Sequence, residues 1–177
     1  MQMSVISSRD RLRSRAFLFT IPAVVVLLDR LSKWEIVNNL GLYHSVVVVP
    51  GFFNLTRTEN SGAAFDILRD STAAWKHPAL ISISLLAMVI VVVMLWKNSY
   101  ALKRTSIGLA LIFGGAMGNL WDRIVSHRVV DFLDFFLWDY HWPVFNIADS
   151  SIVIGVLLLS SEIFFADSKQ NTGPVSG

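Results

Sequence analysis

The chain alternates between long apolar stretches and shorter polar segments. Four apolar stretches lie at Ala16 to about Asn38, Pro78 to Trp96, Thr105 to Trp121, and Asn146 to Phe165. A bilayer core roughly 30 Å thick requires about 20 apolar residues of helix, and each stretch approaches that length. The second is rich in β-branched residues, but its length favours a spanning helix over a strand. The pattern therefore predicts an α-helical polytopic membrane protein with four transmembrane helices.

Basic residues beside these stretches indicate their orientation. They are Arg9, Arg11, Arg13 and Arg15 before the first stretch, Lys97, Lys103 and Arg104 between the second and third, and Lys169 after the fourth. Because short segments rich in lysine and arginine stay in the cytoplasm, both termini are predicted to be cytoplasmic. The sequence DRLSKW follows the first stretch in place of a small-residue cleavage site, so a retained helix is predicted and not a signal peptide.

The two segments predicted to face outward, about 40–77 and 123–145, differ in pattern. In the first, the runs SVVVV and FFNLTRT flank Pro50-Gly51, which predicts a small extracytoplasmic β-rich element. In the second, aromatic residues alternate with acids from about Phe132 to Trp142, which predicts an amphipathic interfacial segment. We expect residues 1–165 to form a single four-helix membrane domain and residues 166–177 a flexible cytoplasmic tail.

The composition supports a membrane protein. Of 177 residues, 54% are hydrophobic and only 16% are charged, with a mean hydropathy of +0.56. The absence of cysteine excludes a disulfide framework, a thiolate metal site and a cysteine nucleophile. The net charge of +2 is small and the basic residues are scattered, so a role in binding nucleic acid has little support.

Carboxylates and amides gather at one end of the apolar stretches. Asp29, Asn119, Asp122, Asn146 and Asp149 all fall where a stretch begins or ends on the predicted outer side. Ionisable groups at the margin of a membrane cost free energy and usually persist for chemistry, transport or helix pairing. The pattern predicts one polar site built from several helices.

Some of these residues also have a purely structural interpretation. Asp29 and Lys33 are four residues apart, so they can form an ion pair that anchors the end of a helix. Asp122 could cap its helix or pair with Arg123. Asp149 lies in a first helical turn, where a carboxylate stabilises the positive end of the helix dipole.

The third apolar stretch carries small residues at every fourth position. Ala110, Gly114 and Gly118 form a face that allows another helix backbone to approach closely. We interpret this face as a packing surface with little direct chemistry.

Two further acids give Asp149 a potential partner. Asn146 and Asp149 share one helix face, while the adjoining run VVDFLDFF contains Asp131 and Asp134. Two carboxylates held close together share a proton, and such a pair can activate a water molecule and protonate a leaving group. These features do not decide between Asp131 and Asp134.

Five motifs in order resemble one known family. DRLSK, ENSGAAF, GGAMGNLWDR, VVDF and FNIADSS, over about residues 17–165, closely resemble the lipoprotein signal peptidases (signal peptidase II). The resemblance implies an aspartic endopeptidase of the bacterial inner membrane. Such an enzyme removes the signal peptide from diacylglyceryl-modified prolipoproteins, immediately before the lipidated cysteine. The chain departs from the family at His127, where a glycine is usual.

The resemblance implies specific roles for residues. It assigns catalysis to Asp131 and Asp149. It implies a supporting and substrate-binding shell of Asp29, Lys33, Asn60, Gly62, Asn119, Asp122, Arg123 and Asn146. It also implies that the loop with Asn60, Gly62 and Phe65 covers the site.

We expect no cofactor and no metal, because the four histidines lack the close paired spacing of a zinc site. The expected partners are a diacylglyceryl-prolipoprotein substrate and membrane lipid, with the chain active as a monomer and its active site near the outer face.

Two other classes of protein use similar residues. A small transporter or proton channel also places acids and bases within the membrane, but here they gather at one side and the second apolar stretch has none. An assembly protein would use the small-residue face to bind partners. Ion flux in liposomes tests for a transporter, and unchanged function after replacing Asp131 or Asp149 would favour the assembly protein.

Overall fold

The computed structural model describes residues 8–62, 73–98 and 103–170. Within these residues, the helices are α1 (Ser8–Asn39), α2 (Lys76–Asn98), α3 (Arg104–Val125) and α4 (Ile147–Gln170). The strands are β1 (Ser45–Val49), β2 (Phe53–Asn60), β3 (Val129–Leu137) and β4 (Tyr140–His141). Each predicted apolar stretch lies almost entirely within one helix, and α4 continues into the segment predicted as a tail.

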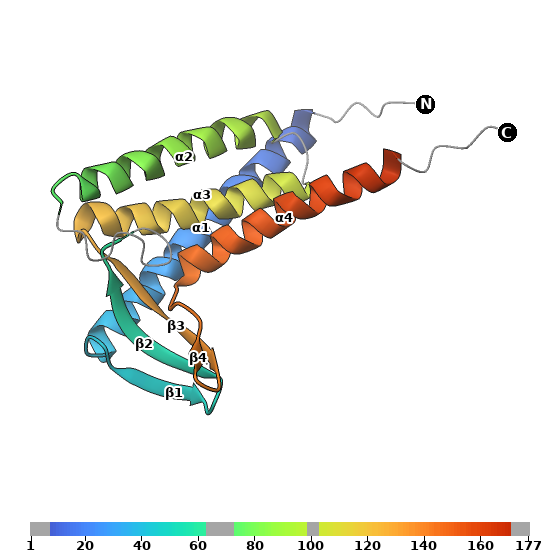
Figure 1. The fold of residues 1–177 in the computed structure, drawn as a ribbon. Coiled ribbons are helices and arrows are strands. Elements are labelled where there is room, and N and C mark those ends of the chain that lie inside the picture. The colour runs from blue at the N-terminus through green and yellow to red at the C-terminus, as the bar shows by residue number, and fades with distance from the viewer. Residues whose placement is uncertain (1–7, 63–72, 99–102, 171–177) are drawn as a thin grey trace.

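The helices pack side by side and the sheet covers one end of them (Figure 1). The start of α1 and the end of α4 lie together at the opposite end. Within the described residues, α2 is the one helix long and apolar enough to cross a membrane, judged by length and composition. Many of its large side chains, such as Leu86, Val89 and Ile90, are more than half exposed.

Helix α3 packs against α1 through the predicted small-residue face. A Cβ atom on Gly114 would lie 2.8 Å from the Cα of Pro22, and one on Gly118 would lie 2.7 Å from Asp29 Oδ2. Ala110 is fully buried. The prediction that this face admits a neighbouring backbone is therefore confirmed.

A second set of glycines brings α3 against α4. A Cβ atom on Gly108 would lie 2.7 Å from the carbonyl oxygen of Gly155, and one on Gly115 would collide with the carbonyl oxygen of Ala148. Because these glycines have no side chain, the first turn of α4 lies directly against α3. This contact fixes where Asp149 projects.

The four strands form one antiparallel sheet in the order β1-β2-β3-β4. Strands β1 and β2 flank the turn at Pro50-Gly51, where Gly51 has a φ of 76°, so the predicted β-rich element is confirmed. Most of the segment from about Phe132 to Trp142, predicted as an amphipathic interfacial segment, lies in β3 and β4 and so forms part of this sheet. Strand β2 supplies hydrogen-bonding partners for the backbone of β3, and Phe135 stacks on Phe53 with 4.5 Å between ring centroids.

Candidate active site

A cavity of about 710 Å³ lies between the helices and the sheet. One part of it is polar and is lined by Asn60, Asn119, Arg123, Asp131 and Asp149. The remaining wall is largely apolar and comes from α2, α3, α4 and the segment before α4, including Ile83, Ala87, Ile112, Ala116, Trp142 and Val153. Both acids that the resemblance implies to be catalytic therefore face the same cavity.

Asn146, directly before α4, contacts both acids. Its side-chain amide donates a hydrogen bond to Asp131 Oδ1 at 2.6 Å. Its backbone N–H donates to Asp149 Oδ2 at 3.3 Å, and its side-chain oxygen accepts from the backbone N–H of Asp149 at 2.9 Å. This reciprocal pairing is a capping arrangement of the kind that stabilises the first turn of a helix. One buried side chain thus ties the acid of β3 to the acid of α4.

The environment of Asp131 raises the pKa of its carboxyl group to about 7. The largest cause is burial, which disfavours the charged form, and the nearby charge of Asp149 acts in the same direction. Hydrogen bonds from Asn146 and Asn60 and the charge of Lys33 oppose the rise in pKa. At neutral pH, Asp131 can therefore hold a proton.

Asn119 on α3 fixes the other acid. Its amide nitrogen donates to Asp149 Oδ1 at 2.7 Å. Its amide oxygen accepts hydrogen bonds from Lys33 Nζ and from the side chain of Asn146, both at 3.2 Å. Because both ends of the amide have partners, its orientation is fixed and its donor group faces Asp149.

The predicted ion pair between Asp29 and Lys33 is present, with 2.8 Å between Nζ and Oδ2. Lys33 Nζ also lies 2.8 Å from Asp122 Oδ2, and Asp29 Oδ1 accepts a hydrogen bond from the backbone N–H of Ala148 at 3.0 Å. These buried charges are paired, as burial requires. Asp29 thereby holds the first turn of α4 against α1.

Asp122 has different partners from those considered in the sequence. It pairs with Lys33 and with Arg30 of α1, and none of its described ion pairs involves Arg123. The interpretation that Asp122 pairs with Arg123 is therefore wrong. On a helix, consecutive residues point in directions about 100° apart, so Asp122 faces α1 while Arg123 lines the cavity.

Arg123 and Asn60 complete the polar part of the cavity. Arg123 donates to the backbone oxygen of Asn119 at 3.3 Å, and its buried Nε has no hydrogen-bonding partner among the described residues. The side-chain oxygen of Asn60 accepts from the backbone N–H of Gly62 at 2.7 Å. Gly62 thus orients Asn60 without lining the cavity itself. Phe65, in the loop expected to cover the site, lies outside the described residues.

A family model described as signal peptidase (SPase) II matches residues 21–165. The chain belongs to the signal peptidase II family. It is 44% identical over 142 residues to the lipoprotein signal peptidase of Solibacter usitatus, which covers 80% of this chain and 86% of that relative. The lipoprotein signal peptidase of Alteromonas mediterranea is 39% identical over 151 residues, or 85% and 82% of the two chains.

Two solved structures have the same fold as this chain. One described as a bacterial membrane enzyme, determined by the in meso method at 2.3 Å resolution, has a TM-score of 0.79 and 31% identity, and the match covers 91% of this chain and 95% of that one. A second, at 1.9 Å, has a TM-score of 0.75 and 32% identity over 84% and 92% of the two chains. This signal peptidase II family member is therefore a bacterial membrane protein with that fold, and the resemblance seen in the motifs is confirmed.

Asp134, which the residue pattern left as an alternative to Asp131, faces away from the cavity. It bonds to Thr56 Oγ1 at 3.1 Å and to His141 Nδ1 at 2.8 Å. Residues three apart on a strand point to opposite faces, so β3 cannot present Asp131 and Asp134 to one site. Recognising Val129–Leu137 as a strand would have separated them.

Trp142 and the apolar residues that line the cavity were not predicted from the sequence to belong to the site. Ile83 and Ala87 lie on α2, where uniform hydrophobicity conceals which side faces the cavity. Ser84 lies between them and lines the same wall, but Ser82 is equally polar and does not line it, so the serines alone did not identify the side that faces the cavity. Arg30, the partner of Asp122, was also missed.

Proposed function

We propose that this chain is an intramembrane aspartic endopeptidase. It removes the signal peptide from diacylglyceryl-modified bacterial prolipoproteins, immediately before the lipidated cysteine. Membership of the signal peptidase II family supports the peptidase class and a prolipoprotein substrate. The observation that carries the aspartic mechanism is that Asp131 and Asp149, from different elements, line one cavity and share the partner Asn146. The alternative of a transporter or proton channel is not supported.

The two acids have complementary roles in this proposal. Asp131, with its pKa near 7, carries a proton and donates a hydrogen bond to the scissile carbonyl oxygen. Asp149 is ionised and removes a proton from a water molecule, whose oxygen then bonds to the carbonyl carbon. As the carbon–nitrogen bond breaks, the leaving amine takes up a proton from the pair. The hydrogen bond from Asn119 holds Asp149 for this step.

Arg123 and Asn60 stabilise the charge that develops on the carbonyl oxygen. A fixed cation in a water-poor cavity is worth more than one in bulk water, and no reorganisation is needed during the reaction. Within the part of the chain that the structure describes, the buried Nε of Arg123 has no hydrogen-bonding partner, which supports this role. Asp29, Lys33, Asp122 and Gly62 act indirectly, by holding the residues that face the substrate.

The apolar wall between α2, α3 and α4 binds the hydrophobic parts of the substrate. We further propose that all four helices span the membrane, with both termini in the cytoplasm and the sheet on the outer side. The start of α1 and the end of α4 lie at the end of the helix bundle opposite the sheet, which supports this orientation (Figure 1). Because one chain supplies both acids, we propose that residues 1–165 act as a single domain and as a monomer.

Cleavage of a synthetic diacylated signal peptide by the purified protein tests the proposal. Asp131→Asn and Asp149→Asn should each abolish cleavage while the thermal unfolding midpoint shows that the protein is folded. Asp134→Asn is the matched control, because Asp134 lies on the same strand but faces away from the cavity. Retained cleavage in either of the first two variants, or loss of cleavage in the presence of a metal chelator, would overturn the mechanism.

A further inference from the structure

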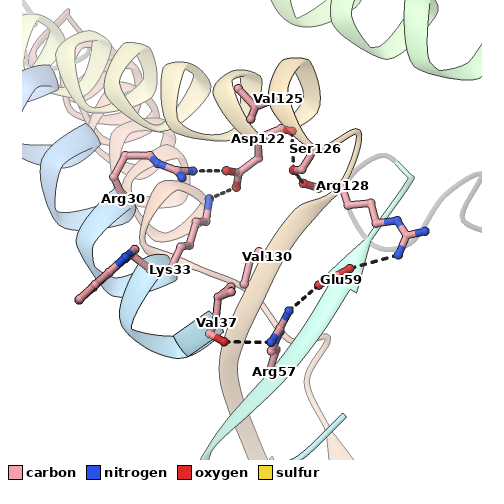
Figure 2. Close-up of a pocket in the computed structure, with 11 residues that line it drawn as sticks. Arg30, Lys33, Val37, Arg57, Glu59, Asp122, Val125, Ser126, Arg128 and Val130 are labelled. Carbon is pink, nitrogen blue, oxygen red and sulfur yellow. Dashed lines mark hydrogen bonds and ion pairs between the residues drawn. The ribbon is translucent and has the colours of Figure 1, made fainter. Parts of the chain in front are cut away.

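A second cavity, of about 470 Å³, is lined by a separate set of residues, which Figure 2 shows. The two cavities share a wall made by β2, β3 and α3. Along the strands, Asn60 and Asp131 face the first cavity, whereas their neighbours Glu59 and Val130 face the second. The alternation of side chains on a strand places the two cavities back to back.

The second cavity has more positive than negative charge. Its lining contains four cations against two carboxylates, namely Arg30, Lys33, Arg57 and Arg128 against Glu59 and Asp122. The buried Asp29 also pairs with Lys33. The cluster of four cations and three carboxylates therefore retains one net positive charge.

Two of these arginines, Arg30 and Arg128, have partly exposed side chains. Arg128 donates to Glu59 Oε2 at 3.2 Å, yet 59% of its side chain is exposed. Arg30 pairs with Asp122 and also lies over the ring of Trp121, with 6.0 Å from Cζ to the centroid. Arg57, by contrast, is held by two backbone carbonyls at the end of α1 and by Glu59 (Figure 2).

Exposed indole rings flank the cavity. Trp34 lines it and is 62% exposed, and Trp121, beside Arg30, is 56% exposed. Tryptophan is enriched at the level of lipid headgroups because its ring is apolar and its N–H is polar. In a membrane protein whose sheet lies on the outer side, the opening of the second cavity is then at the level of the outer headgroups.

We propose that the second cavity binds the phosphate group of an anionic phospholipid from the outer leaflet. A phosphodiester carries a single negative charge, which balances the net charge of the cluster, and guanidinium groups bind phosphate oxygens with directional, charge-assisted hydrogen bonds. Binding at this site is separate from the proposed peptidase reaction, because no residue of the acid pair lines the cavity. A failure of one proposal therefore leaves the other intact.

Native mass spectrometry of the full chain, released from detergent containing equal amounts of phosphatidylglycerol and phosphatidylcholine with the same acyl chains, tests the site. We expect about tenfold preferential retention of phosphatidylglycerol. Arg30→Gln and Arg128→Gln should each reduce that preference. Arg13→Gln, which removes the same charge from an exposed position near the other end of α1, should not.

Inorganic phosphate added in excess distinguishes the source of the anion. Displacement of phosphatidylglycerol supports a phosphate site that also accepts the free ion, and resistance supports recognition of the lipid headgroup. Equal retention of the two lipids by the unmodified protein would overturn the proposal. So would an equal loss of preference in the Arg13→Gln and Arg128→Gln variants. Thermal unfolding of each variant checks that it is folded, and the exposure of Arg128 makes its substitution the safer one.

Discussion

The side-chain amide of Asn146 lies 2.6 Å from Asp131 Oδ1, and this hydrogen bond joins the start of α4 to the first half of β3. The two residues come from the helical layer and the sheet, which otherwise meet mainly through α1 and α3. Because the same asparagine also caps the helix turn that carries Asp149, its buried side chain connects the two acids directly.

Replacing Asn146 by serine should separate its two roles. Serine keeps a good cap for α4, so the loss in the free energy of unfolding should be smaller than for alanine by about 1 kcal/mol. Its hydroxyl does not reach Asp131, so kcat for peptide cleavage should fall by about 10²-fold or more. Asn146→Ala should show the same fall in kcat together with the loss of the cap. Full activity of Asn146→Ser would contradict the bridging role.

The raised pKa of Asp131 predicts how activity depends on pH. Because the proposed reaction needs this carboxyl protonated, kcat/KM should decline above about pH 7. The measurement is initial-rate cleavage across the neutral range, with Asp134→Asn as a variant whose profile should not move. A flat profile through pH 7 would show that the proton is held elsewhere.

The same pKa also predicts a stability profile. The folded pKa of Asp131 lies above its unfolded value of 3.8, so the folded state binds the proton more tightly than the unfolded state. The resulting stabilisation is full below about pH 4 and is lost as the pH rises through about 7. Asp131→Asn removes this contribution. The thermal unfolding midpoint of this variant should therefore rise relative to that of the unmodified protein as the pH increases from about 4 to about 7. A constant difference in midpoint would contradict the raised pKa.

Gly118→Ala should damage both stability and activity. The new methyl group would lie 2.7 Å from Asp29 Oδ2 and 3.2 Å from the Cβ of Ala148, so α1, α3 and α4 must separate. Overpacking of this kind costs about 1–3 kcal/mol. Gly114→Ala is the matched control, because its methyl group would meet Pro22 away from the acids. The Gly114→Ala variant should lose a similar amount of stability. Its kcat, measured per folded molecule, should be higher than that of Gly118→Ala.

His127→Gly should stabilise the protein. His127 has a φ of 58°, in the left-handed region where a side chain costs about 1–2 kcal/mol, and this is the position where the family usually has glycine. After the greater flexibility of an unfolded glycine is allowed for, a net gain of about 0.5–1 kcal/mol is expected. His127→Ala removes the ring but keeps the Cβ atom, so it should show no such gain. A stabilisation by alanine equal to that by glycine would assign the effect to the contact with His77.

Much of the fold follows from local sequence signals. The four helices follow from the length of the apolar stretches, and the β1–β2 pair follows from the turn at Pro50-Gly51 between β-prone runs. The ion pair of Asp29 and Lys33 is also local, because residues four apart share a helix face.

Contacts between distant segments could not be predicted in the same way. Arg30 and Asp122 are 92 residues apart, and no pattern in either helix identifies the other as its partner. The alternation of aromatic residues and acids in β3 is compatible with an interfacial segment as well as with a strand, so the face that carries Asp131 was not apparent. Gly115 was missed because the period of four through Gly114 and Gly118 drew attention to the side of α3 that meets α1.

The hydrogen bond from the backbone of Ala148 to Asp29 bears on how this enzyme can evolve. Of the standard residues, proline alone would delete this main-chain donor at position 148, and the crowding by α3 leaves little room for a larger residue there. A bacterium exposed to an inhibitor of the cavity would therefore find few tolerated changes around Ala148. Resistance should arise instead on the α2 wall, at positions such as Ile83 and Ala87, whose side chains carry no part of the polar network.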